Sequence, residues 1–233
     1  MPLSQIGNKI GNQSRNQGGT QNALFRSSVP VRLAVTAVAL LIWFGTQALI
    51  GARGAPTAGI ADGIHAATAA ENLYLHHHPG AANLLLAGSS AIIDLLGIFL
   101  LSRWIFRGEL RPFLGLVIVL GLRQIMQAVV ALPAPPNAIW HSPGIPSLLV
   151  TYGVANDYFF SGHTAIAVLG ATEMARAGKR WLTSVAVAIV AFEASTVLVL
   201  RAHYTMDVFT GLIAGLYVAH LADRICSPTR DQS

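Results

Sequence analysis

Asp157-Tyr-Phe-Phe-Ser-Gly-His-Thr164 leads directly into an apolar run, which places polar residues at the start of an expected helix. Ser161 is a favourable helix N-cap, and Gly162 lets a ligand approach the backbone closely. The free N–H groups at a helix start, together with the helix dipole, attract anions. We therefore expect Ser161, Gly162 and His163 to border an anion site.

A second polar stretch, Arg201-Ala-His-Tyr-Thr-Met-Asp207, follows about forty residues later. On a helix, the spacing of His203 and Asp207 places both on one face, where the carboxylate can accept Nδ1–H and leave Nε2 free. Two histidines, a carboxylate and a helix N-terminus suit a phosphate ester, with one histidine attacking phosphorus and the other protonating the leaving oxygen. The alternative is structural: His163 caps its helix, and His203 only bonds Asp207.

The composition excludes an ordinary soluble domain. Of 233 residues, 53% are apolar and only 11% are charged, and the mean hydropathy is +0.55, which is typical of a membrane protein. A single cysteine, Cys226, excludes an internal disulfide and a cysteine-ligated zinc site. The net charge is +5, but no stretch resembles a nucleic-acid-binding module, so no nucleic-acid partner is expected.

Six apolar runs, each close to the roughly 20 residues that span a bilayer as a helix, predict an all-α polytopic membrane protein with a six-transmembrane-helix bundle. The runs cover residues 33–50, 80–101, 112–132, 161–177, 181–200 and 204–222. We expect the membrane domain to extend over 31–226. Residues 1–30 are polar and predict a disordered cytoplasmic tail, and 227–233 a second cytoplasmic tail.

The basic residues predict the orientation. Twelve of the fifteen Lys and Arg residues lie before the first run, between the second and third, between the fourth and fifth, or after the sixth. Because basic loops stay in the cytoplasm, both termini are expected there. The ends that carry His163 and His203 then face the outer, extracytoplasmic or periplasmic, leaflet.

The two motifs carry a family resemblance. Ser161-Gly162-His163-Thr164 and His203-Tyr204-Thr205-x-Asp207 resemble the histidine motifs of the type-2 phosphatidic acid phosphatase superfamily. With Asp157 four residues before the first motif, and Arg123 nine residues before Leu132-Pro133-Ala-Pro135, the pattern is similar to the sphingomyelin synthase branch. The resemblance implies that His203 becomes phosphohistidine, that Asp207 orients it, and that His163 protonates the departing alcohol and later activates the acceptor.

Three further residues are candidates for substrate binding. Arg123 lies inside an apolar run, where it either holds phosphate or forms an ion pair with Asp94 or Glu193. Arg201 either contacts phosphate or is a snorkelling surface arginine. Asp157 either caps the following helix, orients the first histidine, or meets a cationic head group.

Other features concern loops and packing. The proline-rich loop 133–160 is expected to wall the mouth of the site, with Trp140 as an interfacial anchor. The run His76-His77-His78 suggests either metal binding or an interfacial loop. Since two histidines perform the proton and nucleophile chemistry, we expect no metal and no cofactor. Gly211 and Gly215 form a small-x-x-x-small pattern, which predicts tight helix packing.

The sequence therefore favours a lipid phosphotransferase that moves a phospho-head group from a phospholipid to ceramide or diacylglycerol, so its partners are membrane lipids. The alternative is a lipid phosphate phosphatase, in which water is the acceptor. A third hypothesis is a non-enzymatic membrane protein, such as a lipid-binding scaffold or a transporter.

Overall fold

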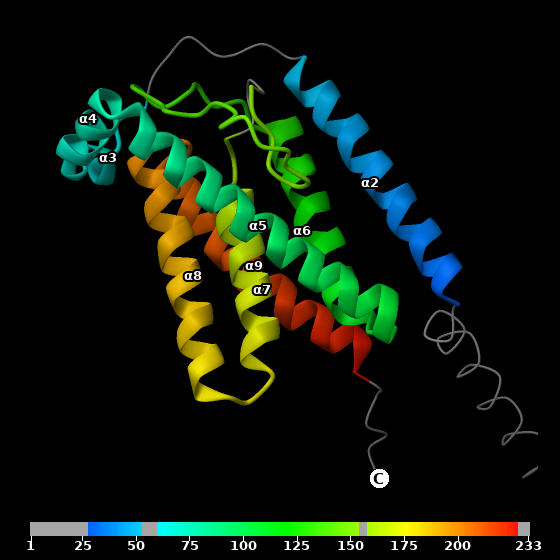
Figure 1. The fold of residues 1–233 in the computed structure, drawn as a ribbon. Coiled ribbons are helices and arrows are strands. Elements are labelled where there is room, and N and C mark those ends of the chain that lie inside the picture. The colour runs from blue at the N-terminus through cyan, green and yellow to red at the C-terminus, as the bar shows by residue number, and fades with distance from the viewer. Residues whose placement is uncertain (1–27, 53–59, 154–157, 228–233) are drawn as a thin grey trace, which may run out of the picture.

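The computed structural model describes residues 28–52, 60–153 and 158–227, and within these ranges all regular structure is helical (Figure 1). The all-α prediction is confirmed. The helices are α2 (Val29–Gly51), α3 (Gly63–Ala67), α4 (Ala69–His77), α5 (Pro79–Arg107), α6 (Leu110–Val129), α7 (Gly162–Ala175), α8 (Arg180–Val199) and α9 (Thr205–Cys226). Nearly all of both expected tails, and Asp157, lie outside the described residues.

Six of these helices coincide with the six apolar runs, but the count of six spans is not confirmed. Five helices, α2, α5, α6, α8 and α9, are long and apolar enough to cross a membrane. The sixth, α7, has 14 residues, or about 21 Å of helix, against a hydrocarbon core of about 30 Å. The structure therefore supports an integral membrane protein with five candidate spans.

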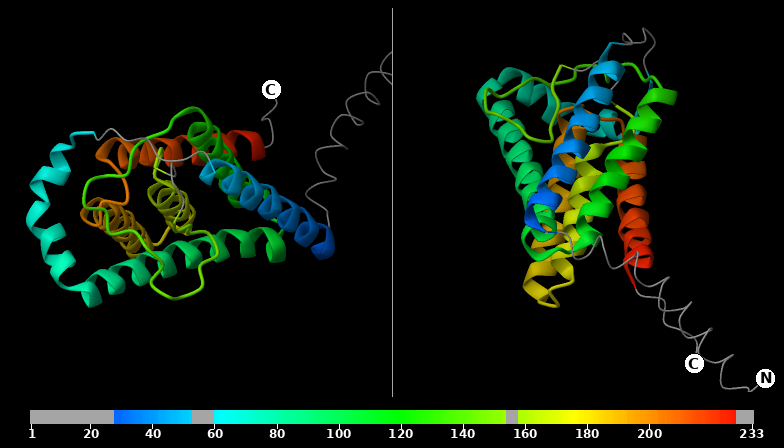
Figure 2. Two further views of the ribbon diagram at one scale, coloured as in Figure 1. Left: turned by 90° about the horizontal axis from the view of Figure 1, so that it is seen from above. Right: turned by 90° about the vertical axis from the view of Figure 1, so that its right-hand side faces the viewer.

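Helix α7 lies at the centre of the bundle, and the view from above shows α5, α6, α8 and α9 around it (Figure 2). Every residue from Ser161 to Gly170 is buried. A helix that is buried on all sides needs no polar face, which explains why this short segment is apolar all round. It begins where the Ser161 side chain accepts the N–H of Thr164 at 3.3 Å.

Helix α9 packs very closely against α7. A Cβ atom at Gly211 would lie 2.5 Å from the carbonyl oxygen of Ser161, and one at Gly215 would lie 2.9 Å from that of Ala165. Only glycine permits this approach of two backbones. The tight packing expected from the two glycines is confirmed, and it brings the starts of the two helices together.

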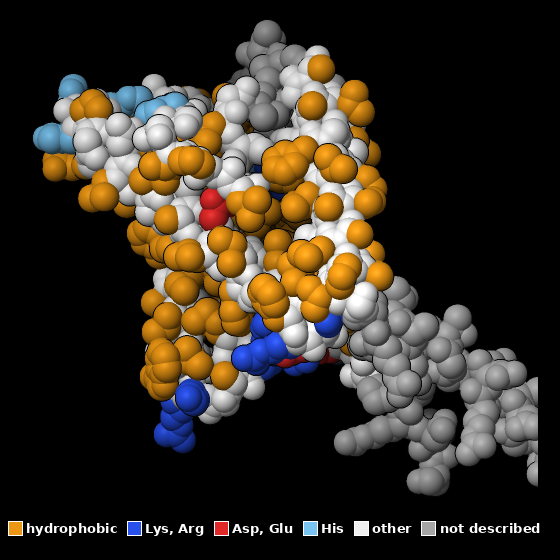
Figure 3. All heavy atoms as spheres, turned by 45° about the vertical axis from the view of Figure 1, so that its right-hand side comes forward, with side chains coloured by type: hydrophobic (Ala, Val, Ile, Leu, Met, Phe, Trp, Pro, Cys, Tyr) orange, Lys and Arg blue, Asp and Glu red, His pale blue; other side chains and the backbone are white. Residues whose placement is uncertain are grey.

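The two ends of the bundle differ in charge. Basic side chains gather at one end and histidines at the other (Figure 3). At the basic end, the buried carboxylate of Glu173 accepts hydrogen bonds from Arg103 and Arg111 at 2.9 Å and lies 3.4 Å from Arg176. This network joins α5, α6 and α7. The histidine motifs lie at the opposite end of the bundle.

Residues 130–153 and 158–161, the described parts of the connection called loop 130–161, cover the opposite end. Its backbone is held by Asp94 of α5, whose carboxylate accepts the N–H groups of Leu148 and Leu149 at 2.8 and 2.9 Å. Trp140 of this loop contacts Tyr152, with ring centroids 4.9 Å apart. The loop therefore forms a fixed wall over the start of α7, as its prolines predict.

Candidate active site

His163 is the second residue of α7 and is 93% buried, since its exposed fraction is 7%. Its ring meets the edge of Trp140, with centroids 5.2 Å apart. Its Nε2 atom is buried and has no hydrogen-bond partner. An unpartnered imidazole nitrogen at a cavity wall is free to exchange a proton with a ligand.

His203 lies just before α9, because that helix begins at Thr205. The expectation that His203 and Asp207 occupy one helical face is therefore wrong. Nδ1 of His203 instead donates to the carbonyl oxygen of Tyr158 at 2.7 Å. A carbonyl only accepts, so Nδ1 carries the proton and Nε2 keeps its lone pair.

Asp207 still lies beside this imidazole, with its Oδ2 atom 3.8 Å from Nδ1 of His203. That oxygen accepts the backbone N–H of Tyr204 at 2.9 Å and so closes the first turn of α9. The backbone carbonyl of Asp207 accepts the N–H of Ser161 at 3.0 Å. Asp207 therefore joins the two motifs and places a negative charge near His203.

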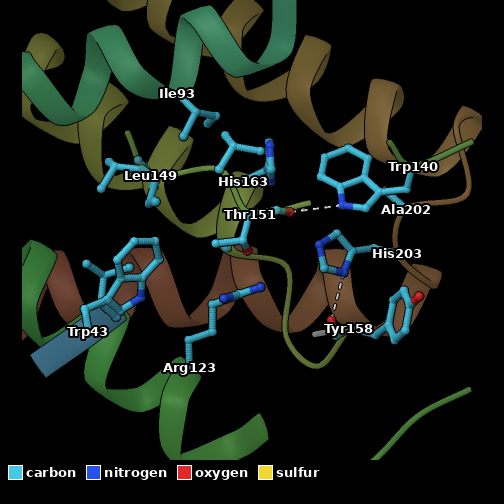
Figure 4. Close-up of a pocket in the computed structure, with 14 residues that line it drawn as sticks. Trp43, Ile93, Arg123, Trp140, Leu149, Thr151, Tyr158, His163, Ala202 and His203 are labelled. Carbon is cyan, nitrogen blue, oxygen red and sulfur yellow. Dashed lines mark hydrogen bonds between the residues drawn. The ribbon is translucent and has the colours of Figure 1, made fainter. Parts of the chain in front are cut away.

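Both histidines line one buried cavity of about 30 Å³ (Figure 4). A volume of this size holds roughly one or two water molecules. Arg123, Gly162, Trp140 and Tyr158 also line it. The close-up shows residues from α6, α7, loop 130–161 and the α8–α9 connection reaching the same space. The cavity thus combines two imidazoles, one guanidinium and the start of a helix.

Arg123 reaches this cavity from α6. Its Nε donates to the carbonyl of Phe160 at 3.3 Å, and a Cβ atom at Gly162 would lie 2.8 Å from the same nitrogen. The carboxylates considered as its ion-pair partners are bonded elsewhere: Asp94 to the loop backbone, and Glu193 to Ser89 at 2.6 Å. Arg123 lies on the cavity wall, and its phosphate-binding role stays a prediction.

Arg201, in contrast, is not among the residues that line the cavity. It is buried, and its guanidinium donates to the carbonyls of His65 at 2.8 Å and Pro136 at 3.3 Å. Neither a phosphate contact nor a snorkelling surface arginine describes this geometry. Arg201 holds two loops together.

A short cap, α3 with Asp62 before it, covers the second motif. Nε2 of His65 donates to the carbonyl of His203 at 2.9 Å, and its ring stacks on Tyr204 with centroids 5.6 Å apart. From the sequence, the histidines that follow in this loop suggest either metal binding or an interfacial loop, and no role is predicted for His65. Asp62 carried a recognisable N-cap signal, but no local pattern identifies its partner on α9.

The histidine run also contacts backbone. His76 donates through Nε2 to the carbonyl of Asn137 at 3.1 Å, and His78 donates through Nδ1 to that of Tyr74 at 2.8 Å. Among the described residues, no group of three or more His, Cys, Asp and Glu side chains is arranged to hold a metal ion. These histidines join α4 to loop 130–161 and stabilise the end of α4.

Fold and site together define a class: an all-α integral membrane protein in which two histidines from separate motifs share a buried cavity. Residues 61–224 match the family model described as AtPDCT1/2. The match covers more than half of the chain, and the protein belongs to the AtPDCT1/2 family.

Phosphatidylcholine:diacylglycerol cholinephosphotransferase 1 of Arabidopsis thaliana is 25% identical to this chain over 153 residues. Those residues are 66% of this chain and 50% of the relative, so the chain spans about half of the relative's length. No solved structure matches the chain. The similarity is to a lipid phosphotransferase, as the motifs predict, while the narrower sphingomyelin synthase branch is not confirmed.

Proposed function

We propose that this protein is a membrane phosphotransferase that moves the phosphorylated head group of a phospholipid to a lipid alcohol. One observation carries the proposal: His163 and His203, from motifs about forty residues apart, line the same cavity as Arg123. The name of the Arabidopsis thaliana relative supports phosphatidylcholine as donor and diacylglycerol as acceptor. Ceramide, the other acceptor that the motifs suggest, has no such support.

In the first half-reaction, Nε2 of His203 attacks the donor phosphorus. A P–N bond forms while the P–O bond to the diacylglycerol leaving group breaks. His163, which enters the cycle as an imidazolium, gives a proton to the leaving oxygen and becomes neutral. The guanidinium of Arg123 and the N–H groups at the start of α7 stabilise the negative charge on the other phosphate oxygens. The product of this step is a phosphohistidine at His203.

In the second half-reaction, a new diacylglycerol replaces the first. Neutral His163 removes the proton from its hydroxyl as the oxygen bonds to phosphorus and the P–N bond breaks. Both histidines return to their starting states. Because one phosphodiester is exchanged for another, the cycle balances without a further reactant.

Head-group transfer is tested with the purified protein in lipid vesicles. The vesicles contain phosphatidylcholine labelled in its choline group and diacylglycerol with acyl chains of a different length. Mass spectrometry should detect labelled phosphatidylcholine that carries the chains of the diacylglycerol. His203→Ala should abolish this product, and His77→Ala, at an exposed histidine, should not. A fully active His203→Ala variant would overturn the proposed nucleophile.

The phosphatase alternative differs only in its acceptor, because water can occupy the position of the alcohol. Vesicles that contain phosphatidate instead of phosphatidylcholine distinguish the two activities. Release of inorganic phosphate without head-group transfer would support the phosphatase. The absence of both activities, together with an unaffected His203→Ala variant in cells, would support the non-enzymatic hypothesis.

The proposed orientation places both termini in the cytoplasm and the cavity at the outer leaflet. It is supported by the basic residues at the end of the bundle opposite the histidines. Cys226, the single cysteine, lies at the end of α9. A membrane-impermeant maleimide should label it in inside-out vesicles and leave it unlabelled in right-side-out vesicles; the reverse pattern would invert the topology.

A further inference from the structure

Helix α2 lies at the edge of the bundle (Figure 1) and packs against α6. A groove of about 390 Å³ is lined mainly by these two helices. Its volume falls within the range of roughly 300–1,000 Å³ that is usual for small-molecule sites. Ile42, Val117 and Ile125 line the groove and are exposed on the outside of the bundle. Trp43 and Leu120 line both the groove and the histidine cavity. The groove therefore connects the lipid-facing surface with the wall of the candidate active site.

Two buried glutamines lie between the same helices. Gln124 of α6 lines the groove and donates through Nε2 to Oε1 of Gln47 of α2 at 2.8 Å. Among the described residues, the amide NH2 of Gln47 and the carbonyl of Gln124 have no partner. Only Gln124 of the two lines the groove. Its open atom is the carbonyl oxygen, or the amide N–H if both amides are turned over. Gln124 therefore offers a ligand one hydrogen-bonding group.

Two more polar atoms of the groove are unpartnered. The indole N–H of Trp43 and the hydroxyl of Thr36 are buried and make no hydrogen bond to a described residue. A bilayer interior supplies no water for such groups, so leaving them unsatisfied is costly. Among the described side chains that line the groove, none is charged. The complementary ligand is therefore neutral, mostly apolar, and equipped with both a hydroxyl and hydrogen-bond acceptors.

We propose that the α2–α6 groove binds the acceptor lipid alcohol, a neutral diacylglycerol, with its polar end at Gln124. A hydroxyl both donates and accepts, and so it matches the open group of Gln124 in either orientation of the amide. The ester carbonyls match the N–H of Trp43, and the acyl chains match the apolar walls. The role of this diacylglycerol as acceptor rests on the proposed function, whereas its binding in the groove does not.

The two proposed binding sites, one for the neutral lipid alcohol and one for the phospholipid donor, differ in charge. A phosphate carries a negative charge and needs a cation in a medium of low dielectric constant. Arg123 provides that cation in the histidine cavity, and the groove lining has none. The donor phosphate is thus held at Arg123 while the neutral alcohol approaches from α2 and α6, across the wall formed by Trp43 and Leu120.

Photoaffinity labelling tests the binding directly. The full-length protein in phosphatidylcholine vesicles is irradiated with a diacylglycerol that carries a diazirine in one acyl chain, and labelled peptides are mapped. Labelling should fall on α2 and α6 and should be displaced by unlabelled diacylglycerol in preference to additional phosphatidylcholine. Labelling confined to other helices, or equal displacement by both lipids, would overturn the proposal.

A pair of glycine variants gives a matched control. A Cβ atom at Gly121, in the groove lining, would meet nothing within 4 Å, so a longer side chain can start there without a clash, and Gly121→Leu should fill part of the groove. Gly45 has the same open surroundings but lies on the exposed face of α2. Gly121→Leu should remove most of the labelling on α2 and α6, and Gly45→Leu should retain it. Equal labelling in the two variants would contradict the site.

The glutamines are tested by a double substitution with side chains of similar length. Gln47→Met/Gln124→Met removes the open group of Gln124 together with its bond to Gln47. The loss of one hydrogen bond to the ligand predicts about fivefold to tenfold weaker displacement by diacylglycerol. KM for diacylglycerol should rise while KM for phosphatidylcholine stays constant. Labelling is repeated in His203→Ala, which binds without turnover. If the groove is labelled in His203→Ala but the native protein shows no transfer activity, the proposed function is rejected, whereas diacylglycerol binding in the groove is confirmed.

Discussion

The carboxylate of Asp62 accepts two hydrogen bonds from Thr205, across 143 residues of sequence: one from its N–H at 2.6 Å and one from its hydroxyl at 2.7 Å. The same carboxylate accepts the N–H groups of Ile64 and His65 at the start of α3. Thr205 is the first residue of α9 and follows His203 by two positions. Asp62 therefore fixes the cap to the segment that carries the second histidine.

This contact predicts that the cap loosens in acid. Burial acts to raise the pKa of Asp62, but hydrogen bonds from Thr205 and His65 outweigh it and hold that pKa below 3.8. A carboxyl group whose pKa is lower in the folded protein than in the unfolded chain stabilises the fold fully above the unfolded-state pKa. This stabilisation is lost as the pH falls through the folded-state pKa. Hydrogen-exchange protection of Gly63–Ala67 should therefore decline below pH 3.8. Asp62→Asn should show weaker protection without this pH dependence, whereas Glu71→Ala should behave as the native protein.

Asp207→Asn separates the charge of this residue from its structural bond. Asparagine can still accept the N–H of Tyr204, so the melting temperature should change little. The charge lies 3.8 Å from the His203 ring, and losing its attraction to a developing imidazolium costs about 4 kcal/mol at an effective dielectric constant of 20, or up to about 10³-fold in kcat. An unchanged kcat would show that the Tyr158 carbonyl alone positions His203.

The helices themselves could largely be predicted from the sequence, because apolar runs mark burial. The run 161–177 corresponds to α7, Gly162–Ala175, and the run 181–200 to α8, Arg180–Val199. Composition does not show whether an apolar helix is surrounded by lipid or by other helices of the protein. Helix α7 is covered by its neighbours, and for this reason a count of apolar runs gives one more crossing than helix length supports.

The candidate site could be predicted only where side chains carry a motif. The positions of His163 and His203 at one end of the bundle follow from the two motifs, and their catalytic roles stay predictions. The partner of Nδ1 in His203 is the backbone carbonyl of Tyr158, which has no side-chain signature. Arg201 shows the limit of charge as a signal: it suggests a phosphate contact, two of its guanidinium nitrogens bond backbone carbonyls in this structure, and its role in phosphate binding stays a prediction.

The two buried arginines should therefore respond differently to substitution. Arg123→Gln removes the cation from the cavity, so we expect kcat/KM to fall by about 10²-fold or more while the fold persists. Arg201→Gln removes donors from the His65 and Pro136 carbonyls, so hydrogen-exchange protection of α3 should fall first. Activity assays and exchange measurements on both variants check this contrast. Equal kinetic losses per folded molecule would place Arg201 in the phosphate site after all.

Gly211→Ala should separate the two histidine motifs. The added methyl group would lie 2.5 Å from the Ser161 carbonyl oxygen, a backbone atom that cannot turn away. Overpacking of this kind costs about 1–3 kcal/mol of unfolding free energy, and it shifts α9 away from the start of α7, so activity should fall as well. Gly88→Ala, with open space around its Cβ position, should be neutral or slightly stabilising. Thermal unfolding in detergent micelles measures both.

Glu173→Gln should destabilise the protein without changing its chemistry. The carboxylate is nearly inaccessible, with 1% of the side chain exposed, and it faces Arg103, Arg111 and Arg176. Removing its charge takes away the one buried anion that the three arginines share, while Glu109 still pairs with Arg103 and Asp223 with Arg111 and Arg176. The cost should therefore stay below about 3–5 kcal/mol, the cost of breaking a fully buried ion pair. Glu109→Gln also removes a carboxylate near Arg103, but Glu109 is 32% exposed, so the cost should be about 1 kcal/mol or less. For both variants, KM for phosphatidylcholine and kcat per folded molecule should match the native values, because the network lies at the end of the bundle opposite His163 and His203. A lowered kcat in folded Glu173→Gln would instead reveal coupling between the two ends through α7.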